Sequence, residues 1–425
     1  MRSVSWTLPY PALRTAKRLQ RQLLELNVER GTLSVVRSFF MSTQTIPFSS
    51  GIARVVSLAE LQDCDAWKNA FATKSKDHRF YEIVEATIEP RFDYHYLIFE
   101  DNAGTIRGIQ PIFFVQQNLV EGIPALKRSV NAVRQIFPRF LTMRLLMTGC
   151  VAGEGHLGAC APEDEAWIAE ALASVLKIFA RQKKASLVVF KDFSARYRAP
   201  LKSLLANGFT RVPSMPMTKL RLGYTDFENY LESLSKATRK NLRRKFRKAA
   251  KAAPIELEVV SDITPCVEEI YPLYLQVHER SPMKFERLTK EYFCSVGRRV
   301  PERTRFFIWR QRGKVIAFSL CMVHQGTIYD EYLGLDYAVA LDLHLYFYTL
   351  RDIIAWALAQ GLENYCSSPL NYNPKLHLGC VLFPLDLYVS HTVGWLNPIF
   401  GRVLKLLGPT RHDPVLRRFP NADQL

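Results

Sequence analysis

The stretch that decides the fold is residues 304–335, which read TRFFIWRQRGKVIAFSLCMVHQGTIYDEYLGL. Three apolar runs rich in β-branched and aromatic residues, at 304–310, 315–323 and 327–335, are separated by the polar connections QRGK and HQG. Glycine in a short polar connection between two such runs is typical of a β-hairpin. The stretch therefore predicts three consecutive antiparallel strands.

A helix and two more strands are expected after these three. Asp342 is a suitable N-cap and Gly361 is placed to end the helix. Between them, apolar residues recur at helical spacing, namely Leu343, Phe347, Leu350, Ile354 and Leu358. Two later apolar runs, 362–366 and 382–389, predict strands. The segment as a whole indicates a mixed α/β unit.

The same order of elements occurs earlier in the chain. Apolar runs at 94–99, 106–115 and 145–151 predict three strands, and a Gly-rich stretch at 153–158 reads as a loop. A helix that opens with Pro162-Glu163-Asp164-Glu165 and a short strand at 187–190 follow. Chance is the alternative explanation, because short strands are easily misassigned from one sequence. The matching order favours a duplication, and hence an α/β protein (α+β, mixed sheets) with two similar domains.

Five segments are expected along the chain. They are a basic N-terminal extension (1–50), a first domain (51–230), a basic connecting helix (231–255), a second domain that would be catalytic (256–395) and a C-terminal tail (396–425). Residues 1–40 hold seven Lys or Arg and two acids, which suits either a transit peptide or an extension outside the fold. The apolar stretch 393–407, with Arg402 and Lys405, is expected either to touch a membrane surface or to pack on the second domain.

Composition limits the class of protein. The 425 residues are 48% hydrophobic and 23% charged, which excludes wholesale disorder. A formal net charge of +17 predicts attraction to phosphate or to an anionic surface. The eight cysteines form no CxxC pair and the nine histidines show no metal-binding spacing, so we expect no metal and a reducing, cytoplasmic location. No apolar run is long enough to span a bilayer.

The repeated order of elements resembles the GNAT acyltransferase fold, and two tandem copies resemble the FemAB-like and Fem-type transferases over residues 52–395. This resemblance implies acyl transfer, with acetyl-CoA or another acyl-CoA as co-substrate. It also implies that the loop after the third strand holds the CoA pyrophosphate. The implied cofactor-binding residues here are Gly334, Leu341, Asp342, Leu343 and His344. Tyr337 to His344 contain none of the glycines of the family's pyrophosphate motif, and Asp342 would repel phosphate.

The segment 236–251 is the most basic in the chain. It holds nine Lys or Arg, and no acid lies between Glu232 and Glu256. The pattern predicts a helix capped by Ser235 that docks one apolar stripe and exposes a cationic ridge to an anionic partner. A merely solvated face and binding to tRNA or DNA are the alternatives. The order of residues resembles a stretch of Fem-type transferases that binds the phosphates of a cell-wall precursor, and the matching positions are Lys236, Arg239, Asn241 and Arg243.

Asp330 and Glu331 are candidates for the base of an acyl transfer, since they are adjacent acids inside an apolar strand. Neighbouring strand residues point to opposite faces, so only one is expected to line a cleft, and we favour Glu331. Charges that protect an edge strand from aggregation are the alternative. Further along, Tyr372 and Lys375 match a Tyr–Lys stretch near the end of FemAB-like domains. There Tyr372 would act as an acid and Lys375 would hold a phosphate or carboxylate.

The function expected from these observations is N-acyl transfer. An acyl group, expected to be acetyl from acyl-CoA, would pass to an amine of a phosphate-bearing or saccharide-linked acceptor. Two alternatives stay open. One is a Fem-type transferase of cell-wall precursor synthesis that uses aminoacyl-tRNA. The other is a non-catalytic phosphate-binding module of the same fold.

Overall fold

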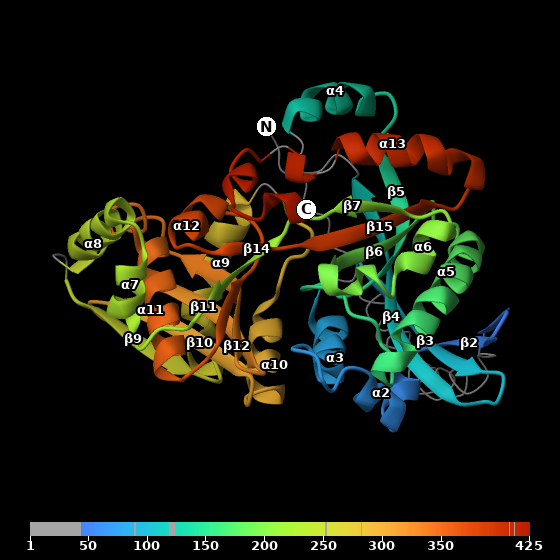
Figure 1. Cartoon of the computed structure of the whole chain (residues 1–425), viewed down its shortest axis with the longest axis horizontal. Coiled ribbons are helices and arrows are strands. Elements are labelled where there is room, and N and C mark those ends of the chain that lie inside the picture. The colour runs from blue at the N-terminus through green and yellow to red at the C-terminus, as the bar shows by residue number, and fades with distance from the viewer. Residues whose placement is uncertain are drawn as a thin grey trace, which may run out of the picture. The chain divides into compact units, whose positions relative to one another are not determined.

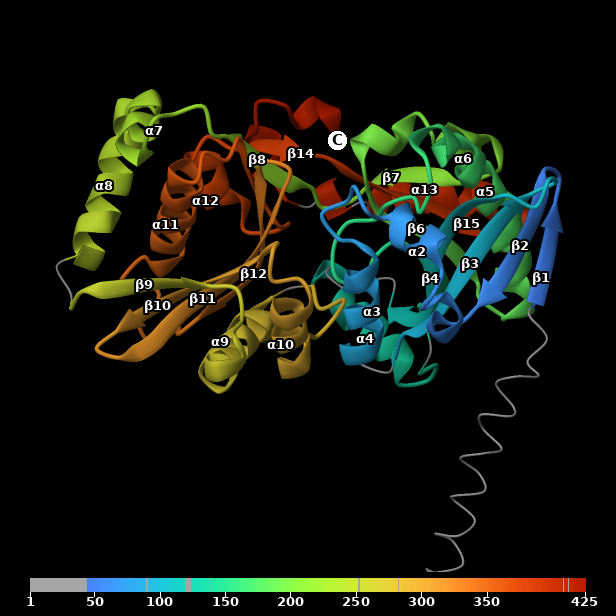
Figure 2. The ribbon, with the colours of Figure 1, turned by 90° about the horizontal axis from the view of Figure 1, so that it is seen from below.

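The computed structural model describes residues 44–88, 91–118, 124–138, 140–250, 253–281, 283–407, 409–411 and 413–425. Most of the N-terminal extension expected at 1–50 therefore lies outside the described residues. Residues 45–425 form one compact unit. Within it, two β-sheets lie next to each other, as both views show (Figures 1 and 2).

The first sheet has eight strands in the order β1-β2-β3-β4-β5-β6-β15-β7. Strands β2 to β5 are antiparallel neighbours, and β6 lies parallel to β5. The bounds are β1 (Gln44–Phe48), β2 (Gly51–Val56), β3 (Asp93–Asp101), β4 (Ile106–Asn118), β5 (Thr142–Thr148), β6 (Leu187–Ser194), β7 (Thr210–Pro213) and β15 (Leu385–His391).

The second sheet has seven strands in the order β14-β8-β13-β12-β11-β10-β9. It repeats the arrangement of the first sheet, because β9 to β12 are antiparallel neighbours and β13 lies parallel to β12. The bounds are β8 (Met217–Arg221), β9 (Ile255–Val260), β10 (Thr304–Gln311), β11 (Lys314–His324), β12 (Thr327–Leu335), β13 (Asn364–Ser367) and β14 (Val381–Phe383). Both predicted meanders, the duplication and the fold class are thereby confirmed.

The two sheets exchange strands reciprocally. In each sheet, the second-last position is filled by a strand from the other half of the chain: β15 lies between β6 and β7, and β8 lies between β13 and β14. Residues 214–216 connect β7 to β8, and Pro384 alone connects β14 to β15. The boundaries expected at 230 and 256 therefore do not divide the sheets, and the predicted strand 382–389 is two strands in different sheets.

Helices cover both faces of each sheet. In the first sheet, α5 packs on one face, and α2 and α3 pack on the other. In the second sheet, α11 packs on one face, with α7 and α8 beyond it. The pair α9 and α10 packs on the opposite face of the second sheet. The bounds are α2 (Asp65–Ala70), α3 (His78–Thr87), α4 (Pro124–Arg134), α5 (Glu165–Gln182), α6 (Lys202–Ala206), α7 (Phe227–Ser233), α8 (Lys236–Ala250), α9 (Val267–Arg280), α10 (Lys290–Arg299), α11 (Leu345–Ala359), α12 (Tyr372–His377) and α13 (Asn397–Leu407).

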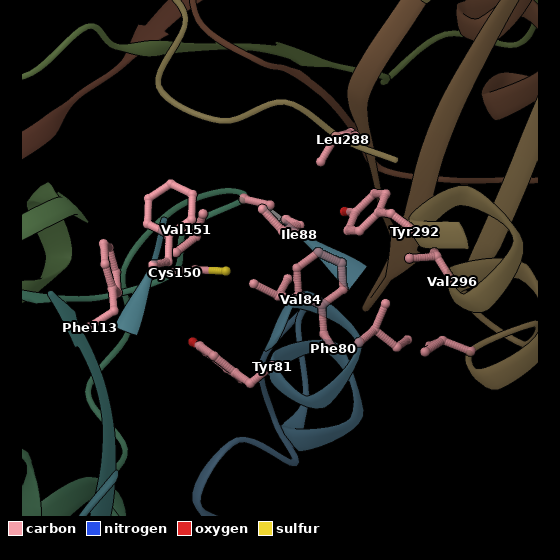
Figure 3. Close-up of a cluster of buried hydrophobic side chains, with 14 of the residues drawn as sticks. Phe80, Tyr81, Val84, Ile88, Phe113, Cys150, Val151, Leu288, Tyr292 and Val296 are labelled. Carbon is pink, nitrogen blue, oxygen red and sulfur yellow. The ribbon is translucent and has the colours of Figure 1, made fainter. Parts of the chain in front are cut away.

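One hydrophobic core is shared by the two halves. Strand residues alternate between cores, so that Phe306 and Ile308 of β10 face this shared core while Phe307 and Trp309 face the core under α11. Figure 3 shows side chains of α3, such as Phe80 and Val84, meeting those of α10 and the segment before it. Separating the halves would expose this apolar surface to water.

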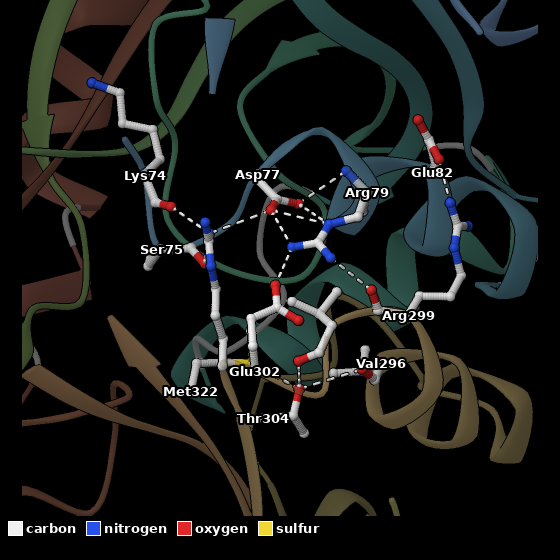
Figure 4. A network of polar contacts seen from close by, with 12 residues as sticks. Lys74, Ser75, Asp77, Arg79, Glu82, Val296, Arg299, Glu302, Thr304 and Met322 are labelled. Carbon is white, nitrogen blue, oxygen red and sulfur yellow. Dashed lines mark hydrogen bonds and ion pairs between the residues drawn. The ribbon is translucent and has the colours of Figure 1, made fainter. Parts of the chain in front are cut away.

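A polar network borders the shared core. Figure 4 shows Asp77 bonded to Arg79, and Arg79 paired in turn with Glu302 from the second half. Arg303 of the second half donates to the carbonyl oxygens of Lys74 and Ser75, at 2.9 and 3.3 Å. The second half thus holds the loop 74–77 of the first half in place.

Asp386 anchors the exchanged strand β15. Its side chain is fully buried, and its carboxylate oxygens accept from Arg198 at 2.7 Å and from Arg211 at 2.9 Å. Removing one partner of a buried ion pair leaves uncompensated charge.

We predict that Asp386→Ala lowers the free energy of unfolding by about 3 kcal/mol in urea titrations. Glu268→Ala, which breaks the exposed pair with Lys290, is the matched control and should cost less than about 1 kcal/mol. Equal effects would contradict the anchoring role.

Candidate active site

A cavity of about 660 Å³ lies between the two sheets. Its walls come from both halves, since Met147 of β5 and Val189 of β6 face residues 330–333 of β12 and the loop 367–371. The volume is typical of a small-molecule site. The crevice expected between the two halves is therefore present.

The cavity opens where β12 and β13 separate. They pair from Thr327↔Asn364 to Asp330↔Ser367, and beyond that point β12 continues to Leu335 beside β11 alone. At the point of separation β12 contains a β-bulge, because Cys321 pairs with Asp330 while Leu320 pairs with Tyr332, which leaves Glu331 as the extra residue. Bulges redirect side chains next to active sites.

The bulge changes the expectation for the two acids. Asp330 and Glu331 both line the cavity and both are almost fully buried, although neighbours in a regular strand would point to opposite faces. β12 also lies inside the sheet, between β11 and β13, so the edge-strand explanation for these charges does not hold. The expectation that only one acid reaches the cleft was wrong, because it assumed a strand without a bulge.

Lys76 connects the two halves at the cavity. Its Nζ lies 2.9 Å from Oε1 of Glu331 and 3.0 Å from Oε2 of Glu154. All three side chains are at most 8% exposed. Glu154 also accepts from Oγ of Ser75 at 3.2 Å. One ammonium group is thus shared by a carboxylate of the first half and a carboxylate of the second.

The two carboxyl groups that share the ammonium group of Lys76 have different pKa values. Burial raises the pKa of Glu331, and the repulsion of Glu154 adds to it while Lys76 opposes it, so that the pKa is about 7. Burial also acts on Glu154, but Lys76 and His156, whose Nε2 lies 3.5 Å from Oε1 of Glu154, outweigh it and hold the pKa of Glu154 well below its usual range. Although burial alone lowers the pKa of Lys76, the two carboxylates raise it. Of these three groups, Glu331 is the one whose pKa lies near neutral pH.

The Gly-rich loop 153–158 delivers Glu154 to this cluster. Gly153 has a φ of +136°, and a Cβ there would collide with Nζ of Lys76. Lys191 donates to the carbonyl oxygen of Gly153 at 3.1 Å and fixes the loop from β6. The loop assignment agrees with the sequence, but Glu154 and Lys76 were not predicted. The glycines around Glu154 were a usable signal, whereas Lys76 stands in an ordinary polar stretch.

Asp330 and Lys375 belong to a second polar region of the cavity. Tyr365 donates to Oδ2 of Asp330 at 2.8 Å, and burial raises the pKa of Asp330. The Nζ of Lys375 donates to the carbonyl oxygens of Ser368 and, at 2.8 Å, Leu370. Burial lowers the pKa of Lys375 to about 8. Lys375 lines the cavity, as a substrate-binding residue would have to.

The residues expected to hold CoA phosphate are differently placed. Leu341 lines the cavity, whereas Gly334 packs against α9, where a Cβ would lie 2.8 Å from the amide nitrogen of Tyr274. Eight backbone amides between 336 and 345 donate to oxygens of the protein itself. Asp342, Leu343 and His344 belong to this self-bonded turn, and His344 has a φ of +47° at the start of α11. The turn therefore offers few free donors to a pyrophosphate.

The basic helix α8 is confirmed as a helix, and Oγ of Ser235 accepts from the amide of Thr238 as its cap. It packs on α7 and α11, away from the other sheet in both views (Figures 1 and 2). Within the described part of the chain, the cavity lining includes none of Lys236, Arg239, Asn241 and Arg243. Arg243 pairs with Glu228 of α7 at 2.7 Å, so an acid of another helix neutralises part of the positive charge of α8.

Tyr372 is also set apart from the cavity. Its hydroxyl donates to the carbonyl oxygen of Pro216 at 2.8 Å, its ring packs against Phe419, and the side chain is buried. These contacts fit a structural role on α12. Over the described residues there is likewise no group of three or more His, Cys, Asp or Glu side chains that could hold a metal ion.

Comparison with known families gives a match that covers more than half of the chain. Residues 137–367 match the sequence model of the FemAB_like family, described as peptidoglycan biosynthesis/recognition. The chain belongs to the FemAB_like family. The matched region runs from before β5 through β13 and so contains Glu154, Asp330 and Glu331. No curated protein matches this FemAB_like chain.

Solved structures are similar to the FemAB_like chain in fold. FemX aligns with a TM-score of 0.50 and 11% identity over 83% of this chain and 99% of its own. L-PGS from Bacillus licheniformis (TM-score 0.44, 11% identity, 79% and 97% of the two chains) is also similar. So is a tandem GNAT protein from the clavulanic acid biosynthesis pathway (0.44, 11%, 80% and 98%).

The contact between Gly153 and Lys76 can be tested by mutation. We predict that Gly153→Ala lowers the free energy of unfolding by about 3 kcal/mol, because the methyl group adds a collision with Lys76 to backbone strain. Gly104→Ala is the control, since Gly104 has a φ of +81° with no atom within 4 Å and should cost about 1 kcal/mol. Urea unfolding of both variants gives the difference. If the two variants unfold alike, the packing of Lys76 against the loop is refuted.

Proposed function

We propose that this FemAB_like protein transfers an activated acyl group to an amine, in the cavity between its halves, with Glu331 as general base. The observation that carries the proposal is a buried carboxyl with a pKa of about 7, placed by a β-bulge at the point where β12 leaves β13. A base with a pKa near the operating pH is the most effective in proton transfer. The fold shared with FemX and the family description support the assignment.

The proposed reaction has one bond made and one broken. An acceptor that binds as an ammonium first releases one proton to water. The neutral nitrogen then attacks the carbonyl carbon of the donor to form a C–N bond and passes its second proton to Glu331. The C–S bond of a thioester, or the C–O bond of an ester, then breaks, and the leaving sulfur or oxygen takes the proton from Glu331. Lys76 and Glu154 are positioning residues that orient the carboxylate and set its pKa.

The cavity suits a cationic acceptor. Five acids line it, namely Glu154, Asp192, Glu286, Asp330 and Glu331, against the lysines Lys191 and Lys375 and against Lys76, which pairs with Glu154 and Glu331. Such an excess of acid attracts an ammonium group. The family description supports an amine of a peptidoglycan-related molecule, which is saccharide-linked and, as a precursor, phosphate-bearing. Lys375 is the residue that we propose for contact with a carboxylate or phosphate of that molecule.

Two donors fit the proposal. Acyl-CoA, with acetyl as the first candidate, is the donor implied by the GNAT arrangement, and Leu341 to His344 would lie nearest its phosphates. A specific observation favours aminoacyl-tRNA as the second candidate: the amides of the turn 336–345 are largely used within the protein. For that donor, α8 would supply phosphate contacts through Lys236, Arg239, Asn241 and Arg243. All eight cysteines are free, which supports a reducing cytoplasmic site of action.

The role of Glu331 predicts a pH dependence. Only the ionised carboxylate accepts a proton, so kcat/KM should fall as the pH drops below about 7. Glu331→Gln should lower kcat/KM by roughly 100-fold and remove this limb of the profile. The control is Glu85→Gln, which removes a half-buried glutamate whose pKa is also raised by burial and which is bonded to Tyr96 outside the cavity lining. A limb that persists in Glu331→Gln would assign the base to another group.

The donor can be identified with two assays on the purified protein. Release of free thiol from a panel of acyl-CoAs, lost in Glu331→Gln, is expected for a CoA donor. Transfer from aminoacyl-tRNA, weakened at least tenfold by Arg239→Glu with Arg243→Glu, is expected for the second donor. Activity in cells that survives Asp330→Asn with Glu331→Gln but not the α8 charge reversal would contradict catalysis and indicate a phosphate-binding module.

A further inference from the structure

Helix α13 is apolar on two faces, only one of which is covered. Phe400 and Leu404 pack toward the shared core, and Gly401 lies close to Thr210 of β7. The stretch 393–407 therefore packs on the first sheet, through β15 and β7, and not on the second domain as one expectation had it. An apolar face of a helix is normally buried against another element. The uncovered face of α13 lacks that burial.

Large apolar side chains gather on this uncovered face. Trp395, just before the helix, is 73% exposed, Ile399 is 56% exposed and Val403 is 43% exposed. Their spacing of four residues places them on one side of α13. The turn after α4 adds Ile136 at 76% and Phe137 at 64%. Figure 1 shows α4 and α13 along the same upper edge of the view, and Figure 2 shows that they lie apart along the other axis.

The two stretches of sequence that carry these residues have charges of one sign. The sequence contains no Asp or Glu from 387 to 412 and three Lys or Arg, and none from 122 to 153 with five Lys or Arg. Arg402 and Arg411 are exposed. Exposed tryptophan and aliphatic side chains beside cationic charge are the features of a helix that lies in the interface of an anionic bilayer.

We propose that the exposed face of α13, with the turn after α4, docks on an anionic lipid bilayer. Two copies of the chain would bring like charges together on this face, which disfavours a dimer and favours lipid headgroups. The contact is interfacial, because no helix among the described residues is both long and apolar enough to cross a membrane. The inference rests on exposure and charge and is independent of the proposed acyl transfer.

Flotation of the full chain with vesicles tests the proposal. Wild-type protein should bind vesicles that contain phosphatidylglycerol more tightly than vesicles of phosphatidylcholine alone, and added salt should weaken binding. Trp395→Glu with Ile399→Glu should reduce binding roughly tenfold or more. The matched control is Ile178→Glu with Leu205→Glu, two apolar residues of α5 and α6 that are 40% and 47% exposed, and it should bind like the wild type. Thermal unfolding should be unchanged in both double variants.

Three results would overturn the proposal. The first is wild-type protein that binds neither vesicle, and the second is equal binding by the α13 double variant. The third is a wild-type dimer in gel filtration that the α13 double variant converts to a monomer, since this would make the face an interface between copies. Acyl transfer to a water-soluble amine acceptor, measured in parallel, should be the same in the wild type and both double variants. Acyl transfer without vesicle binding would overturn the lipid-docking proposal alone. Vesicle binding without acyl transfer would overturn the proposed function alone.

Discussion

The contact on which the account depends is a single buried ammonium group shared by two carboxylates. Lys76 and Glu154 come from the first half and Glu331 from the second, and water reaches at most 8% of any of them. One positive charge cannot compensate two buried negative charges, so one carboxyl must hold its proton more tightly. The additional partners of Glu154, Ser75 and His156, decide that this carboxyl is Glu331. The burial of the three groups together thus brings the pKa of Glu331 near neutral pH.

The rest of the fold keeps these three groups together. The halves share a hydrophobic core, Arg303 holds the loop that carries Lys76, and each half lends its last strand to the sheet of the other. An exchanged strand such as β15 cannot leave its sheet without unpairing from β6 and β7. The distance from Lys76 to Glu331 is therefore set by the packing of the whole unit and not by a mobile domain interface.

The sequence predicts what depends on local pattern. Runs such as 304–310 and 327–335, with turn residues between them, predict their strands because alternation and turn chemistry act over a few residues. Asp330 and Glu331 were identifiable as acids within an apolar strand. The bulge at Glu331 was not, because it depends on pairing with β11 across the sheet. Lys76 was also missed, because its partners lie 78 and 255 residues away. The strand exchange escaped for the same reason, since β7 and β8 are short and their partners come from the other half.

The central claim is that Glu331 exchanges its proton near neutral pH because Lys76 is shared. Carbon-13 NMR of protein labelled at the glutamate carboxyl groups measures this most directly, by comparing titrations of the wild type and of the protein with glutamine at position 331. The account predicts one carboxyl resonance that titrates near pH 7 in the wild type and is missing in the substituted protein. A resonance at that pH which survives the substitution, or no glutamate that titrates above about pH 5.5, would contradict it.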